Sequence, residues 1–235
     1  MIPAFSDFQT PNPVFGATIQ GQINWAVDAL MTSLPNPEHL SIEQQRDILT
    51  RYTAVLEGNF IYWMTGAYLA VKSEEARSII LDNLREEVRD CHPGMLRRFA
   101  LAAHAIPTDT DAQTVQRDLM NVRLFVGRLQ AVPIVVMMAF FEGFIQKFMP
   151  YLAELAGRRG SLEREYTDVH GICDIAHSQE LFRALASEMM FHSSEPETDI
   201  FEGVNLLRGL IQTIVQGPAQ NSLAFHHSNG SALTA

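Results

Sequence analysis

Cysteine and positive charge are both scarce in this chain of 235 residues. Its two cysteines, Cys91 and Cys173, provide no disulfide framework, so we read both as small core residues and expect a reducing, cytoplasmic compartment. Lysine and arginine number 17 against 27 aspartates and glutamates, which gives a formal net charge of −10. This balance argues against nucleic acid and anionic membranes as partners, because both require clustered basic residues.

Long apolar runs and a basic leader are also missing. The most apolar segment, between Arg128 and Glu142, is 13 residues long, whereas a membrane-spanning helix needs about 20. No basic region precedes an apolar run at the N-terminus, so we predict neither a signal peptide nor a membrane span. The sequence also lacks an internal repeat, a glycine-rich phosphate loop and the alternation typical of strands.

The sequence does contain a succession of helix signals. Ser41 with Gln44 forms a capping-box pattern that opens a long helix to about residue 72, and Ser73 is the expected N-cap of the next helix, to about residue 90. Pro133 is expected either to kink a helix or to begin one, and Ser161 is expected to cap another. The remaining helices are predicted at about 22–33, 94–105, 111–129, from Pro133 to about 156, from Ser161 to about 192, and 200–216. We therefore predict an all-α fold of seven to nine helices in one domain, 1–217, followed by a disordered tail, 218–235.

The most informative polar residues are His170, Asp174 and His177. Their offsets of 0, 4 and 7 fall within about 60° of one another on a helix. Imidazole and carboxylate are ligands that suit iron, manganese and zinc, although three polar residues also fit a solvated face. The apolar residues Leu181, Leu185 and Met189 continue the same row, which favours a face that points inward.

Carboxylates also occur where a core is expected. Glu57 and Glu142 each interrupt an apolar helix, where an unpaired charge costs several kcal/mol. A metal ion would compensate that charge, and so would an arginine beside Glu57, such as Arg51 or one on another helix. A further segment carries Glu86, Glu87 and His92, residues that also fit a solvated face. Three histidines and four carboxylates exceed the needs of one zinc ion and suit a dinuclear centre in a helical bundle, although the usual Glu-x-x-His pair is missing.

These motifs resemble those of the haem-oxygenase-like di-iron oxidases over about residues 20–215. The family's His-x3-Asp-x2-His element matches His170, Asp174 and His177, and its middle acidic helix corresponds to the one that carries Glu142. Its Asn-Leu-x-x-Glu segment, followed by a histidine, matches Asn83, Leu84, Glu87 and His92. Arg89 stands where the family often has glycine, so Glu86 stays open as the alternative to Glu87. The resemblance implies a haem-oxygenase-like bundle and two iron ions held by Glu57, Glu87, His92, Glu142, His170, Asp174 and His177.

The same resemblance implies that two irons activate O2 and oxidise a small substrate between the helices. Members of the family N-oxygenate substrates, cleave carbon–carbon bonds, release terminal alkenes or form nitriles. Length and overall character most resemble the nitrile-forming type, which acts on a brominated tryptophan and yields an indole-3-carbonitrile, so an amino-acid-like substrate and a homodimer are expected by analogy. The aromatic residues that would suit such a substrate, or simply fill the core, are Phe60, Tyr62, Trp63, Phe140, Phe141 and Phe144. The competing interpretations are a metal-free enzyme similar to thiaminase-II or the quinone-cofactor synthase, and a helical scaffold.

Overall fold

A computed structural model describes residues 18–191 and 199–217, and these form helices and no strand. The elements are α1 (Ile19–Thr32), the 3-10 helix η2 (Pro37–His39), α2 (Ile42–Ala70), α3 (Glu74–Arg89), α4 (His92–Ala102), α5 (Asp109–Val126), α6 (Ala131–Arg158), α7 (Glu165–Met189) and α8 (Glu202–Gln216). The predicted all-α fold is confirmed. The predicted disordered tail, 218–235, lies outside the described residues.

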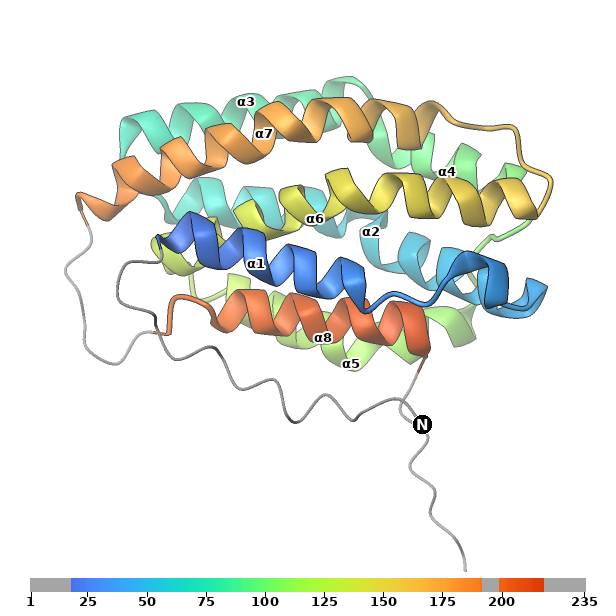
Figure 1. The fold of residues 1–235 in the computed structure, drawn as a ribbon. Helices are drawn as coiled ribbons and strands as arrows, with labels where there is room; N and C mark the ends of the chain where they lie inside the picture. The colour runs from blue at the N-terminus through green and yellow to red at the C-terminus, as the bar shows by residue number, and fades with distance from the viewer. Residues whose placement is uncertain (1–17, 192–198, 218–235) are drawn as a thin grey trace, which may run out of the picture.

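The helices are arranged in layers around α6 (Figure 1). The pair α3 and α7 lies along one side, α2 and α6 pass beneath it, and α5 and α8 lie on the opposite side. Helix α6 contacts α1, α2, α7 and α8, and every residue from Val132 to Glu142 is buried rather than one stripe alone, as expected of the central part of a core helix. By length and composition α6 would be able to cross a membrane, but 83% of its most apolar stretch is buried inside the protein.

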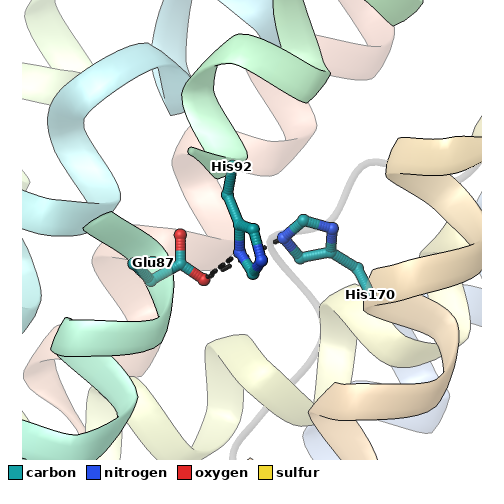
Figure 2. A group of neighbouring side chains, drawn as sticks. All are labelled: Glu87, His92 and His170. Carbon is teal, nitrogen blue, oxygen red and sulfur yellow. Dashed lines mark hydrogen bonds and ion pairs between the residues drawn. The ribbon is translucent and has the colours of Figure 1, made fainter. Parts of the chain in front are cut away.

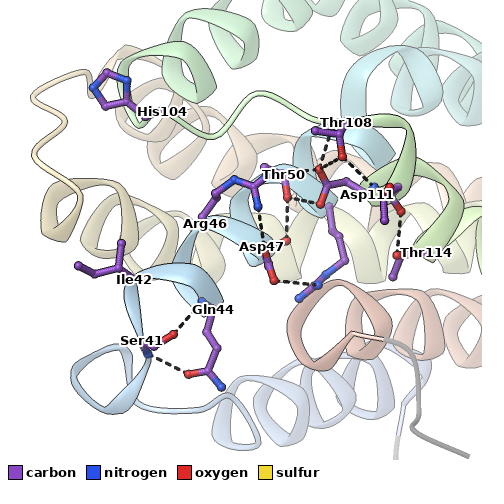
Figure 3. Close-up of polar contacts among 12 residues, drawn as sticks. Ser41, Ile42, Gln44, Arg46, Asp47, Thr50, His104, Thr108, Asp111 and Thr114 are labelled. Atoms are coloured by element: carbon purple, nitrogen blue, oxygen red, sulfur yellow. Dashed lines mark hydrogen bonds and ion pairs between the residues drawn. The ribbon is translucent and has the colours of Figure 1, made fainter.

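Local sequence signals explain most helix starts. The predicted capping box at the start of α2 is present: the Ser41 hydroxyl accepts from the backbone N–H of Gln44, whose side chain accepts from the backbone N–H of Ser41 (Figure 3). Pro133 is the third residue of α6, so it lies in the first turn of a new helix rather than at a kink. The backbone N–H groups of the first turn have no intrahelical acceptor, so the N–H that proline lacks costs no hydrogen bond there.

The predicted cap at Ser161 is wrong. Helix α7 begins at Glu165 without a side-chain cap, and the Ser161 hydroxyl accepts instead from the backbone N–H of Glu163. Gly160 has a φ of 86°, so the chain turns sharply at this point and the following residues are not yet helical.

The face of α7 that carries the histidines points inward, as its apolar continuation predicted. His170 and His177 are 7% and 6% exposed, and Leu181 and Leu185 are buried below them. Met189 is 43% exposed, because it is the last residue of the helix. Helix α7 packs against α6 and α3, so the buried imidazoles face the acidic residues of those helices.

Candidate metal centre

Three buried side chains from three helices converge at one point. Glu87 near the end of α3, His92 at the start of α4 and His170 on α7 each offer one ligand atom, and these atoms lie within 4.8 Å of one another. Figure 2 shows the His92 ring between the Glu87 carboxylate and the His170 ring. The two imidazole centroids are 4.5 Å apart, and Glu87 Oε1 lies 4.0 Å from His170 Nε2.

The joint between α3 and α4 brings Glu87 and His92 together. Cys91 adopts a left-handed conformation with φ 55°, so the helical path breaks there and α4 begins at the next residue. Pro93 then occupies the first turn of α4, where its missing N–H costs nothing. As a result, His92 Nδ1 lies 2.7 Å from Glu87 Oε1. Cys91 itself is exposed, so the prediction of a core cysteine is wrong there, and the side chain of Cys173 lies outside the described residues.

Hydrogen bonds determine which nitrogen of each ring carries the proton. His170 Nδ1 lies 2.8 Å from the backbone oxygen of Tyr166, which can only accept, so Nδ1 donates. An ionised Glu87 likewise only accepts, so His92 donates through its Nδ1. In the neutral tautomers Nε2 is then the basic nitrogen of both rings, an arrangement that orients histidines for metal binding.

A second group of polar residues adjoins this cluster. Glu142 of α6 is 2% exposed, and its Oε1 accepts a 3.0 Å hydrogen bond from Asn83 Nδ2 on α3. His177 of α7 lies between two acids, with Nδ1 3.9 Å from Glu142 Oε2 and Nε2 3.0 Å from Glu86 Oε2. The structure thus places both Glu86 and Glu87 beside histidines, Glu86 in this second group and Glu87 in the first.

Two of the seven residues inferred from the sequence do not appear in either group. The side chain of Asp174, one turn along α7 from His170, lies outside the described residues, so its assignment stays a prediction. Glu57 pairs with Arg97 of α4 instead of approaching the histidines. The sequence left open that an arginine on another helix neutralises Glu57, and Arg97 does so. The other arginine considered, Arg51, donates instead to the backbone oxygen of Ile214.

A cavity borders the first group. Glu87, His92, Glu142 and His170 form its polar wall, and it is otherwise lined by Leu56, Phe60, Ile61, Pro93, Leu96, Phe141, Ile145 and Tyr166. Of the aromatic residues proposed from the sequence, Phe60 and Phe141 face this cavity, whereas Phe140 is fully buried and Tyr62 is 43% exposed.

Sequence reasoning missed Tyr166. Its ring lies 4.3 Å from the His170 ring, its backbone oxygen orients that imidazole, and its hydroxyl is 2.7 Å from the Tyr52 hydroxyl. The available signal was its position one turn before His170, since residues four apart share a helix face.

The donor set fits iron. Two imidazoles and a carboxylate lie together in a buried setting, and a second carboxylate and a third imidazole adjoin them. Such nitrogen and oxygen donors suit ferrous iron. Residues 49–208, from α2 into α8, match a family model described as iron-containing redox enzyme. No curated protein and no solved structure matches the chain.

Proposed function

The chain belongs to a family of iron-containing redox enzymes, and from this premise we propose that it is an O2-dependent, non-haem di-iron enzyme that oxidises a small, amino-acid-like substrate. The observation that carries the proposal is the buried convergence of Glu87, His92 and His170 in the wall of a cavity. Two imidazoles and one carboxylate leave coordination positions open, as a metal that reacts with O2 requires.

Glu87, His92 and His170 would hold the first iron. Glu142 and His177 would contribute to a second, together with Asp174 and Glu57, in line with the seven ligands inferred from the sequence. The proposal of a second iron is supported by the grouping of Glu142, which is 2% exposed, with His177, whose Nδ1 lies 3.9 Å from Glu142 Oε2, because carboxylate and imidazole donors together suit iron. When bound, the irons would supply the electrons that activate O2.

The chain's own residues would position the substrate and exclude water. Leu56, Leu96 and Ile145 give the cavity apolar walls, which keep water from the reacting atoms. Asn83 holds the Glu142 carboxylate, and the backbone oxygen of Tyr166 holds the imidazole of His170. Each polar group is therefore oriented before a substrate arrives.

We further propose an aromatic amino acid as the substrate and its oxidation to a nitrile as the reaction. Support comes from the cavity wall, where the Phe60 and Phe141 rings lie 5.6 Å apart and face the space beside the histidines. Aromatic rings pack favourably against one another, so an indole is a suitable guest for this wall. The resemblance to the nitrile-forming type is the reason for preferring this reaction over N-oxygenation or carbon–carbon cleavage.

An anaerobic titration with Fe(II), followed by O2 and candidate amino acids, tests the proposal. We expect about two irons per chain, O2 uptake that depends on one class of amino acid, and a product identified by mass spectrometry. His170→Ala should lose iron, whereas His39→Ala, on the exposed face of η2, should keep it. A wild-type chain without stoichiometric iron, or equal binding by His170→Ala, would favour the metal-free enzyme or the scaffold.

A further inference from the structure

Helix α2 is interrupted beside the cavity. Glu57 has φ −62° and ψ 93°, and Gly58 has φ 88° and ψ −17°, so neither residue is helical although the helix continues on both sides. A positive φ is disfavoured for every residue with a Cβ, so glycine permits the interruption. Space is not the reason for the glycine, because a Cβ added there would meet no atom within 4 Å.

Side chains from three helices hold this interruption in place. The Asn59 amide donates a 2.7 Å hydrogen bond to the backbone oxygen of Val55, the acceptor that a regular helix would offer to the backbone N–H of residue 59. Arg123 of α5 in turn donates to the Asn59 side-chain oxygen at 2.8 Å. Arg97 of α4 donates to the Glu57 carboxylate. The interruption is therefore a built feature of the fold rather than a frayed turn.

The interruption decides which side of α2 carries Glu57. Glu57 now continues the row of Thr53, four residues earlier, and both line a surface groove together with Arg97, Arg98 and Leu101. If the later part of α2 were extended back as a regular helix, position 57 would instead join the row of Phe60 and Ile61, three and four residues later. Those two residues line the cavity beside Glu87, His92 and His170.

We propose that Arg97 is a positioning residue that holds Glu57 out of the iron centre, and that regularising α2 at Gly58 moves the carboxylate from Arg97 to iron. The inference rests on the proposed function. Arg97 is 67% exposed, and an exposed ion pair contributes little, so a divalent ion in the cavity would compete well for the carboxylate. The two arrangements would form an equilibrium, and the population of the Arg97-bound form would lower the apparent affinity for the second iron.

Two substitutions should shift the equilibrium toward the regular helix by different means. Arg97→Gln removes the guanidinium that retains Glu57, and Gly58→Ala penalises the positive φ while favouring the regular helix. In substrate-free anaerobic titrations, we expect Gly58→Ala to tighten binding of the weaker iron about fivefold. Arg97→Gln should tighten it about threefold. Adding Glu57→Gln to either variant should abolish the gain.

Arg98→Gln is the matched control. Arg98 lies next in the sequence, lines the same groove and pairs with Glu165 at 2.5 Å, so its loss removes the same charge without releasing Glu57. We expect its iron affinity to equal that of the wild type. A tightening equal to that of Arg97→Gln would indicate a general charge effect and would overturn the inference.

A measurement without metal separates this inference from the proposed function. Hydrogen exchange of the amides at 57–61 should slow in Gly58→Ala and Arg97→Gln, because a regular helix protects them. If both variants bind Fe(II) and exchange these amides just as the wild type does, the role of Arg97 is overturned while the di-iron proposal stays intact. A wild-type chain that binds no iron would overturn the proposed function and, with it, this inference.

Discussion

The Glu87 carboxylate and the His92 imidazole face each other across the joint between α3 and α4, with 2.7 Å between Oε1 and Nδ1. Both side chains are about 5% exposed, so the pair is shielded from water. The contact links two helices through residues that we propose as ligands of one iron. It also separates the roles of Glu87 and Glu86, because Glu86 extends toward His177 instead.

Glu87→Gln is expected to weaken Fe(II) binding more than Glu86→Gln. Loss of a ligand charge in the first group should reduce affinity by about tenfold or more. The Glu86 side chain is 43% exposed and contacts His177, so its neutralisation should cost less. Anaerobic Fe(II) isotherms of the two variants provide the comparison, and a larger loss in Glu86→Gln would make Glu86 the ligand.

Glu188→Gln is expected to lower both stability and iron affinity. The carboxylate of Glu188 on α7 is 2% exposed and accepts from the backbone N–H groups of Lys72 and Ser73, just before α3. It therefore fixes α7 relative to α3, and both helices carry proposed ligands. We expect urea denaturation to show a loss of about 1–3 kcal/mol in the free energy of unfolding.

The control for that experiment is Glu154→Gln, which removes an exposed ion pair with Arg158 on α6. Its free energy of unfolding should stay within about 0.5 kcal/mol of the wild type. Equal stability of the Glu188 and Glu154 variants would show that the link between α7 and α3 does not stabilise the fold.

Replacing two glycines of α8 by alanine should change the free energy of unfolding in opposite directions. A Cβ on Gly203 would lie 2.6 Å from the Phe125 ring and 2.8 Å from Met137 Cβ, so Gly203→Ala should cost about 1–3 kcal/mol through overpacking. Gly209 has no such neighbour within 4 Å, so Gly209→Ala should gain up to about 1 kcal/mol of helix propensity. Thermal or urea denaturation measures both, and destabilisation by both would refute the packing argument.

Asp111 should stabilise the protein in a manner that depends on pH. Burial raises the pKa of its carboxyl, but hydrogen bonds from Thr108 and Thr50 and the charge of Arg46 outweigh burial, so the pKa lies below its ordinary value (Figure 3). Because the folded state has the lower pKa, the stabilisation is complete above the ordinary pKa of about 3.9 and is lost as the pH falls through the folded value.

Asp111→Asn should therefore lower the free energy of unfolding by about 1–2 kcal/mol at neutral pH. The difference from the wild type should shrink below about pH 4, as the wild-type carboxyl itself becomes protonated. Denaturant titrations across this range test the prediction. Asp109→Asn, an exposed position in the same turn, serves as the control, and a difference that stays constant with pH would exclude the carboxylate as the cause.

Local signals in the sequence determined the helices and the face of α7. The capping residues Ser41 and Ser73 each act through backbone groups within three residues, so their effect can be read from the chain alone. The inward face of His170 and His177 follows from helix periodicity and from the apolar residues that continue the row. The presence of Glu142 in an apolar run likewise marked it as a buried acid.

Tertiary structure decided which of these side chains meet. The pairing of Glu87 with His92 depends on the left-handed Cys91, and the place of Glu57 depends on Arg97, Arg123 and an interruption at Gly58. A straight helix drawn from periodicity places Glu57 on one face with both Thr53 and Phe60, whereas the interruption leaves it beside Thr53 and away from the cavity. The contacts with α4 and α5 join residues far apart in the chain, and their energies outweigh the small local preference for an unbroken helix.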